Sequence, residues 1–176
     1  MRPGSPRPGP GGARLTALAP ATCRHAGPAD RSDRAVAIAL SQAEAACLRA
    51  GERWTAPRRR TYELLAKAGR PVKAYDLIAA FGPTRRSAKP PTVYRALDFL
   101  ESLGLVHRVT GLSAFIACQK TTGLHRAEFL ICDCCGCADE MEFGAGRLLE
   151  TVAKPHGFQV ERILLEVHGL CPACQG

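Results

Sequence analysis

The chain has 176 residues, of which 46% are hydrophobic, and it carries a formal net charge of +8. This length suits one domain of ordinary size or two small ones, and no run of about 18 apolar residues is present that could span a membrane. A basic chain suits a polyanionic partner such as nucleic acid, although charge alone fits a solvated basic surface about as well.

The charge is distributed unevenly along the chain. Residues 1–31 hold five basic and one acidic side chain, residues 32–112 hold fourteen and seven, and residues 113–176 hold five and eight. The acidic last part also holds seven of the nine cysteines. This division predicts a basic half that binds a polyanion and an acidic half that binds a cation.

Residues 1–31 are rich in Pro, Gly, Ala and Arg and show no apolar periodicity, so we expect them to be disordered. They lack the continuous apolar core of a signal peptide, which leaves a transit peptide or an accidental upstream start. Nine cysteines without a secretion signal indicate a reducing compartment, the cytoplasm, and metal ligands rather than disulfides.

The first part of the basic region predicts three short helices. Ser32 or Asp33 can cap the first, and Pro57 lies in the first turn of the second, where its missing N–H costs little. Arg58 and Arg59 stand near the start of that second helix. The three helices are expected over residues 33–50, 56–68 and about 73–81.

The fourth predicted helix, residues 90–104, is the most informative. Val93, Leu97 and Leu100 recur at helical spacing and predict one buried face, whereas Thr92 and Arg95 lie on another side. Two short alternating segments follow, 105–109 and 113–118, separated by a Thr-Gly turn typical of a hairpin.

Three short helices, a fourth with a polar N-terminal face and a β-hairpin are the order of a winged helix-turn-helix. Such folds place the N-terminal residues of the recognition helix in the major groove. The alternative is an ordinary helical domain whose fourth helix is solvated. The candidate DNA contacts are Thr92, Tyr94, Arg95, Arg58, Arg59 and Lys89.

The acidic half predicts a strand over 128–132, a helix over 144–156 and a long alternating strand over 158–168. A β-α-β arrangement of these elements would bring together the cysteines that follow each strand. Exposed strand edges would also suit dimerisation.

Two C-x-x-C pairs are enough for a tetrahedral zinc site. Residues 171–174 read C-P-A-C, and residues 132–137 read C-D-C-C-G-C, so the first pair is ambiguous. Gly136 allows the turn that points backbone N–H groups at sulfur, which favours Cys132 and Cys135 over Cys134 and Cys137. The expected ligands are therefore Cys132, Cys135, Cys171 and Cys174.

A second set of potential zinc ligands consists of His107, Cys118, His125 and Glu140. These residues are scattered, so spacing does not establish that they converge. Taken singly, a lone His is more often a surface or core residue, and Cys118 more often a small buried apolar one.

Several segments together resemble the zinc uptake regulator branch of the ferric uptake regulator family. They include A-K-P-P-T-V-Y-R-A-L-D-F-L (88–100), F-L-I-C-D-C-C-G (129–136) and L-E-V-H-G-L-C-P-A-C (165–174). The resemblance implies a structural zinc at Cys132, Cys135, Cys171 and Cys174, a regulatory zinc at His107, Cys118, His125 and Glu140, and DNA reading by Tyr94 and Arg95. A single histidine in T-T-G-L-H-R-A-E (121–128), where iron regulators tend to be His-rich, points away from iron.

The sequence thus predicts an α+β fold with three parts: a disordered leader (1–31), a winged-helix DNA-binding domain (32–112) and a small α/β metal-binding dimerisation domain (113–176). The function that the resemblance implies is a homodimeric repressor that binds double-stranded operator DNA when loaded with two Zn²⁺ per chain and represses zinc-uptake genes. An iron- or peroxide-responsive regulator on the same scaffold is the alternative. No H-E-x-x-H, deaminase or nucleophile motif is present, so we expect neither an enzyme nor a small-molecule substrate.

Overall fold

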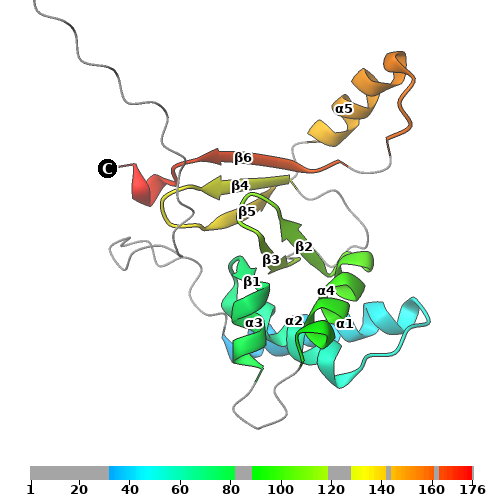
Figure 1. Cartoon of the computed structure of the whole chain (residues 1–176), viewed down its shortest axis with the longest axis vertical. Coiled ribbons are helices and arrows are strands. Elements are labelled where there is room, and N and C mark those ends of the chain that lie inside the picture. Colours follow the sequence, from blue (N-terminus) through cyan, green and yellow to red (C-terminus); the bar gives the residue numbers. More distant parts are fainter. Residues whose placement is uncertain (1–31, 82–88, 119–127, 142–143, 161–162, 176) are drawn as a thin grey trace, which may run out of the picture.

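The computed structural model describes residues 32–81, 89–118, 128–141, 144–160 and 163–175. The predicted leader therefore lies outside the described residues, as does His125. The described elements form a helical part and a sheet part with a β-hairpin between them (Figure 1). Among the described residues, none of the helices combines the length and apolarity needed to cross a bilayer.

Four helices make up the helical part. The helices are α1 (Asp33–Arg49), α2 (Ala56–Ala68), α3 (Ala74–Ala80) and α4 (Pro90–Ser102). The Ser32 side chain caps α1 by accepting the Ala35 N–H at 3.3 Å. Gly69 ends α2 in the left-handed conformation, with φ at 58°. Pro90 and Pro91 open α4, where a helix needs no N–H.

The predicted hairpin is present as β2 (Val106–Val109) and β3 (Ala114–Ala117), which pair antiparallel. A two-residue strand that the sequence did not predict, β1 (Val72–Lys73), adds to the other side of β3. One face of the hairpin, with Val106 and Phe115, packs on the helices. The buried core formed there includes Leu65, Leu77, Val93, Leu97 and Leu100, which confirms the apolar face predicted for the fourth helix.

The sheet part contains β4 (Glu128–Cys132), β5 (Ala138–Met141) and β6 (Leu165–Gly169), in the order β5-β4-β6. Strands β4 and β6 are parallel, and the intervening chain includes β5 and helix α5 (Ala145–Ala153), which continues into a 3₁₀ turn over Lys154–His156. A second 3₁₀ turn, Pro172–Cys174, closes the described chain.

The described sheet differs from the sequence prediction in two places. Strand β5 was missed, because its A-D-E-M sequence carries no apolar alternation. Of the strand expected over 158–168, residues 161 and 162 lie outside the described residues, and the described part forms a strand, β6, only from Leu165, where it pairs with five residues of β4. Alternation predicts which faces a strand could bury, but a ladder extends only where a partner exists.

The hairpin is buried on both faces. Its second face contributes Val109 and Ile116 to a separate apolar cluster with Phe129, Ile131 and Ala138 of the sheet. All four residues of β3 are therefore buried, which explains why A-F-I-A is an uninterrupted apolar run. This hairpin, β2 and β3 with the turn between them, is called the wing below. It packs between the helical part and the sheet part rather than projecting into solvent (Figure 1).

Candidate metal centres and DNA-facing helix

Four cysteine sulfurs gather at one end of the sheet. Cys132, Cys135, Cys137 and Cys171 offer sulfurs that all lie within 4.8 Å of one another. The sulfurs of Cys135 and Cys171 are 3.8 Å apart. In a tetrahedral zinc site with Zn–S bonds of about 2.3 Å, neighbouring sulfurs are about 3.8 Å apart, so this spacing fits a zinc–thiolate site.

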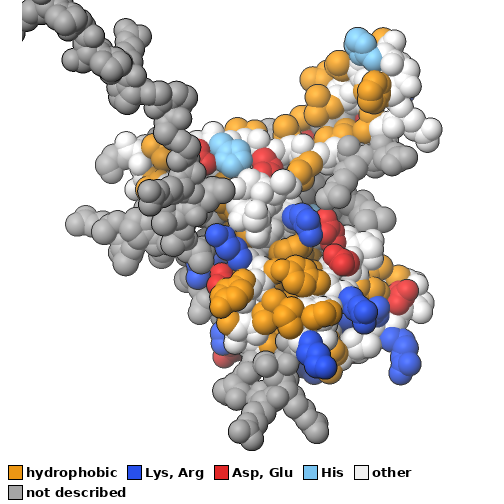
Figure 2. Space-filling model, viewed as in Figure 1, with side chains coloured by type: hydrophobic (Ala, Val, Ile, Leu, Met, Phe, Trp, Pro, Cys, Tyr) orange, Lys and Arg blue, Asp and Glu red, His pale blue; other side chains and the backbone are white. Residues whose placement is uncertain are grey.

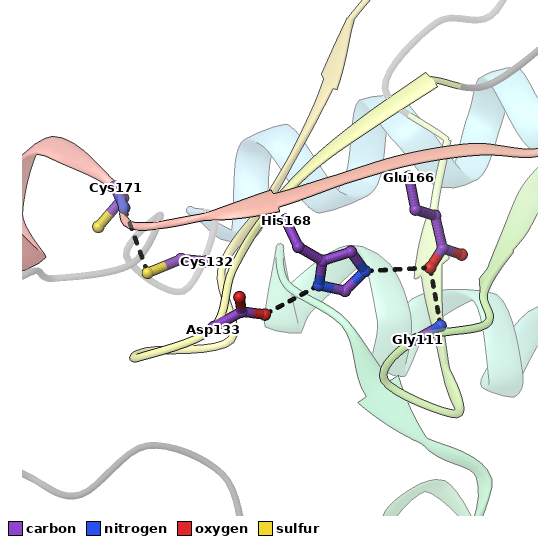
Figure 3. Close-up of polar contacts among 6 residues, drawn as sticks. All are labelled: Gly111, Cys132, Asp133, Glu166, His168 and Cys171. Carbon is purple, nitrogen blue, oxygen red and sulfur yellow. Dashed lines mark hydrogen bonds and ion pairs between the residues drawn. The ribbon is translucent and has the colours of Figure 1, made fainter. Parts of the chain in front are cut away.

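Strand pairing brings these cysteines together. Cys132 is the last residue of β4 and pairs with Gly169 at the end of β6, so both cysteine segments leave the sheet at the same edge. The Asp133 N–H donates to the Gly169 carbonyl at 2.8 Å, and the Cys171 N–H points at the Cys132 sulfur at 3.3 Å (Figure 3). Gly136 adopts the left-handed conformation at φ 68°, which confirms the turn predicted there.

The protonation of two of these thiols is strongly perturbed. Burial opposes ionisation of Cys132, but N–H groups of Cys171, Cys135 and Cys134 aimed at its sulfur lower the pKa to about 6. Cys137 behaves oppositely, because burial and its contact with the Cys135 sulfur raise its pKa. Cys132 is therefore prepared as a thiolate, the form that binds metals.

The structure groups three of the four cysteines expected at this site and adds one that was not. Cys174 is not a member of the group, whereas Cys137 is. The Cys132 N–H donates to the Cys137 carbonyl at 2.9 Å, which folds Cys137 back beside the first pair. This hydrogen bond closes the turn from β4 into β5, the strand that the sequence reading missed. Cys134 is exposed, as suits a residue outside the metal site.

A second group lies between the wing and the sheet. His107 of β2, Cys118 just after β3 and Glu140 of β5 place their ligand atoms within 4.8 Å of one another. His107 Nε2 is 3.6 Å from Glu140 Oε1, and Cys118 Sγ is 4.0 Å from the same oxygen. The structure thus brings together three of the four scattered residues, while His125 lies outside the described residues.

The second group has the chemistry of a metal site. The side chains of His107 and Glu140 are only 12% and 2% exposed, and a bound cation would stabilise a carboxylate held this far from water. The separations are close to the edges of a tetrahedron around zinc, about 3.3–3.8 Å for nitrogen, oxygen and sulfur donors. Phe129 packs edge-on against the His107 ring, with centroids 5.8 Å apart, and restricts its orientation.

Helix α4 presents its N-terminal polar residues to solvent. Tyr94 is 45% exposed, and Arg95 and Lys89 are also exposed, whereas Thr92 is half-buried. Lys and Arg side chains lie mainly over the helical part of the face shown in Figure 2. These positions suit contact with a polyanion.

The two arginines at the start of α2 differ in their surroundings. Arg59 is exposed. Arg58 instead lies over the Phe99 ring, 3.1 Å from its centroid, and donates to the Arg53 carbonyl at 2.5 Å. Its guanidinium group therefore packs α2 against α4, a structural role that the cluster of arginines in the sequence did not indicate.

Comparison with known proteins places this geometry among metal-dependent regulators. The model of the ferric uptake regulator family matches residues 49–168. The zinc uptake regulation protein of Escherichia coli (strain K12) is 36% identical over 137 residues, which cover 77% of this chain and 80% of that protein. A solved zinc uptake regulator complexed with zinc and DNA superposes with a TM-score of 0.75 at 35% identity, covering 79% of this chain and 94% of that one. The structure of holo XcZur gives 0.73 at 43% identity, covering 80% and 98%.

Proposed function

Because the chain belongs to the ferric uptake regulator family, we propose that it is a zinc-responsive transcriptional repressor rather than an enzyme. In this proposal it binds operator DNA as a zinc-loaded dimer in the cytoplasm and represses zinc-uptake genes. The observation that carries the proposal is the buried group of His107, Cys118 and Glu140 at the contact between wing and sheet. The similarity to regulators whose names record zinc uptake, zinc and DNA supports the choice of effector and partner.

Two zinc ions per chain would have different tasks. Cys132, Cys135 and Cys171, with Cys174 or Cys137 as the fourth ligand, would hold a structural ion that ties the end of β4 to the end of β6. His107, Cys118 and Glu140, with His125, would hold the regulatory ion. A thiolate in that set favours zinc over iron, because soft sulfur ligands select zinc.

The regulatory ligands come from separate elements, and this gives the switch. His107 and Cys118 belong to the wing, whereas Glu140 belongs to the sheet, so they converge only while the wing packs against the sheet. The wing follows α4 after a linker of three residues, 103–105, so its posture also sets the posture of the recognition helix. Zinc therefore holds α4 in one posture and raises the affinity for operator DNA. By linkage, operator DNA must raise the affinity for zinc by the same factor.

A homodimer is part of the proposal, and α5 supports it. None of the described α5 side chains is buried, and Leu148, Leu149 and Val152 are 65%, 43% and 55% exposed. Figure 1 shows α5 projecting from the sheet part, and Figure 2 shows hydrophobic side chains along it. A nine-residue helix is marginal on its own, so a second copy of this chain that covers this apolar surface would stabilise it. Two-fold symmetry then calls for a pseudo-palindromic operator.

The direct test of the function is zinc-titrated binding to DNA from the chain's own promoter region, with metal content measured in the same samples. We expect binding to rise with free zinc and to fall steeply as salt increases, because phosphate contacts release counterions. Iron, manganese and peroxide treatment form the comparison arms. Binding that follows iron or peroxide instead of zinc would replace this proposal with the other regulator on the same scaffold.

Arg95→Ala is expected to lose operator binding while keeping both metals and the dimer. The exposed Arg95 side chain stands in the second turn of α4, where an arginine contributes about 1–3 kcal/mol through a base edge. Operator affinity, measured by fluorescence anisotropy, should therefore fall about 10- to 100-fold. Lys154→Ala removes the same charge from the exposed 3₁₀ turn after α5 and should change affinity little. Equal losses in both variants would contradict the assignment of α4 as the reading helix.

A further inference from the structure

One side chain of the sheet holds the tip of the wing. The Glu166 carboxylate on β6 accepts the backbone N–H of Thr110 at 2.5 Å and that of Gly111 at 2.7 Å (Figure 3). The carboxylate is 55 and 56 residues from its partners in the chain, so this contact joins the two parts of the molecule. The Glu166 side chain is only 11% exposed, and an ionised acceptor of two N–H groups makes stronger hydrogen bonds than a neutral one.

Two further side chains, His168 and Asp133, form a chain of polar contacts that ends on Glu166. His168 Nε2 lies 3.7 Å from the Glu166 carboxylate, and its Nδ1 lies 2.8 Å from Asp133 (Figure 3). The contact with Asp133 raises the pKa of His168, which favours the cation between the two carboxylates. Alternation along β6 puts Glu166 and His168 on the face of the sheet that meets the wing, and Val167 on the other.

The contact leaves no room for a side chain at Gly111. A Cβ atom there would lie 2.7 Å from His168 Cε1 and 2.8 Å from Glu166 Oε2. The residue does not need a left-handed backbone, so the close approach of the two side chains, rather than the turn, calls for glycine. The Thr-Gly pair that reads as a simple hairpin turn therefore also forms a docking surface.

We propose that Glu166 is a positioning residue, which clamps the wing tip to the sheet at a second point, separate from the metal ligands at the wing base. None of Glu166, His168 and Gly111 belongs to either cysteine or histidine group that could hold a metal. A wing held at its tip samples fewer conformations before zinc binds. Closing the regulatory ligands around the ion therefore costs less conformational entropy, and the clamp favours both zinc binding and DNA binding. This consequence for DNA rests on the proposed function, whereas the clamp itself does not.

The experiment compares the zinc-loaded full chain with Glu166→Gln, Gly111→Ala and the control Glu44→Gln, which makes the same change at an exposed site on α1. The first readout is amide hydrogen exchange at residues 110 and 111, followed by NMR. A glutamine keeps one acceptor oxygen and turns an NH₂ group toward the second N–H, so exchange at these two amides should quicken about tenfold. Gly111→Ala should have a similar effect at residue 110 by pushing Glu166 away. The control should leave both amides unchanged.

The second readout is operator affinity at saturating zinc. We expect Glu166→Gln to weaken it about tenfold, with both zinc ions, the dimer and the melting temperature close to those of the wild type. Unchanged exchange at residues 110 and 111 would overturn the clamp. Faster exchange with wild-type operator affinity would overturn its effect on the DNA-binding posture. If the wild-type chain binds neither zinc nor operator DNA, the proposed function is refuted. The exchange rates at residues 110 and 111 would still show whether Glu166 holds the wing tip.

Discussion

Cys118→Ser is expected to give a folded dimer that keeps one zinc ion per chain and binds operator at least about 100-fold more weakly at zinc levels that saturate the wild type. Residues that only support a metal ligand cost about 10- to 100-fold in metal affinity when changed, and a ligand itself should cost more. Cys118 is 6% exposed and its sulfur is 4.0 Å from Glu140. Serine has nearly the same shape but offers a protonated hydroxyl in place of a thiolate, so the packing survives and the donor is lost.

The matched control is Cys47→Ser. Cys47 is fully buried in α1 and is not a member of either group of potential ligands. In a helix the serine hydroxyl can donate to a carbonyl one turn back, so the variant should fold with a modest loss of stability. Operator affinity should be plotted against free zinc for both variants. A Cys118→Ser curve that overlays the wild-type curve would remove Cys118 from the sensing site.

The regulatory group shows which parts of a site a sequence reveals. The hairpin could be predicted from its alternation and its Thr-Gly turn, and its register pairs His107 with Ile116, which puts His107 and Cys118 on one face. Glu140 could not be placed in the same way, because its strand is short and polar and owes its position to pairing with Phe129 of β4. Residue type made Glu140 a candidate ligand beside the other two, only the resemblance to a family implied that they converge, and the structure brings all three together.

The group of four cysteines could likewise be predicted only in part from the sequence. That two cysteine segments meet follows from parallel strands ending at one edge, which the β-α-β reading anticipated. Which sulfurs meet depends on a turn of a few residues, where Cys137 returns beside Cys132 through one backbone hydrogen bond. The contact of Glu166 with residues 110 and 111 could not be predicted from the sequence at all. A glycine in a hairpin turn and a glutamate in an alternating strand are both ordinary, so neither residue indicates the contact.

Cys132→Ser is expected to have the largest effect on stability of any single change in the chain. Structural zinc contributes on the order of 10–16 kcal/mol in small zinc-binding peptides, comparable to the whole stability of a domain. Cys132 ends the central strand of the sheet, and its thiolate, with a pKa lowered to about 6, accepts the Cys171 N–H. Loss of this ligand should release one zinc ion per chain, unfold the sheet part and abolish the dimer. Calorimetry, metal analysis and analytical ultracentrifugation of the same preparation would record the three effects.

Cys134→Ser is the internal control, because Cys134 lies in the same turn but is exposed, and it should melt like the wild type with both ions retained. The fourth ligand is then decided by comparing Cys137→Ser with Cys174→Ser. Cys137 is already within the group of sulfurs, whereas Cys174 completes the second C-x-x-C pair, and its N–H donates to the Cys171 carbonyl at 2.8 Å. The variant that reproduces the Cys132→Ser result identifies the ligand, since a four-coordinate structural site has no place for a fifth sulfur. If Cys132→Ser itself keeps both zinc ions and the melting temperature of the wild type, the group of cysteines at the end of the sheet is not a structural zinc site.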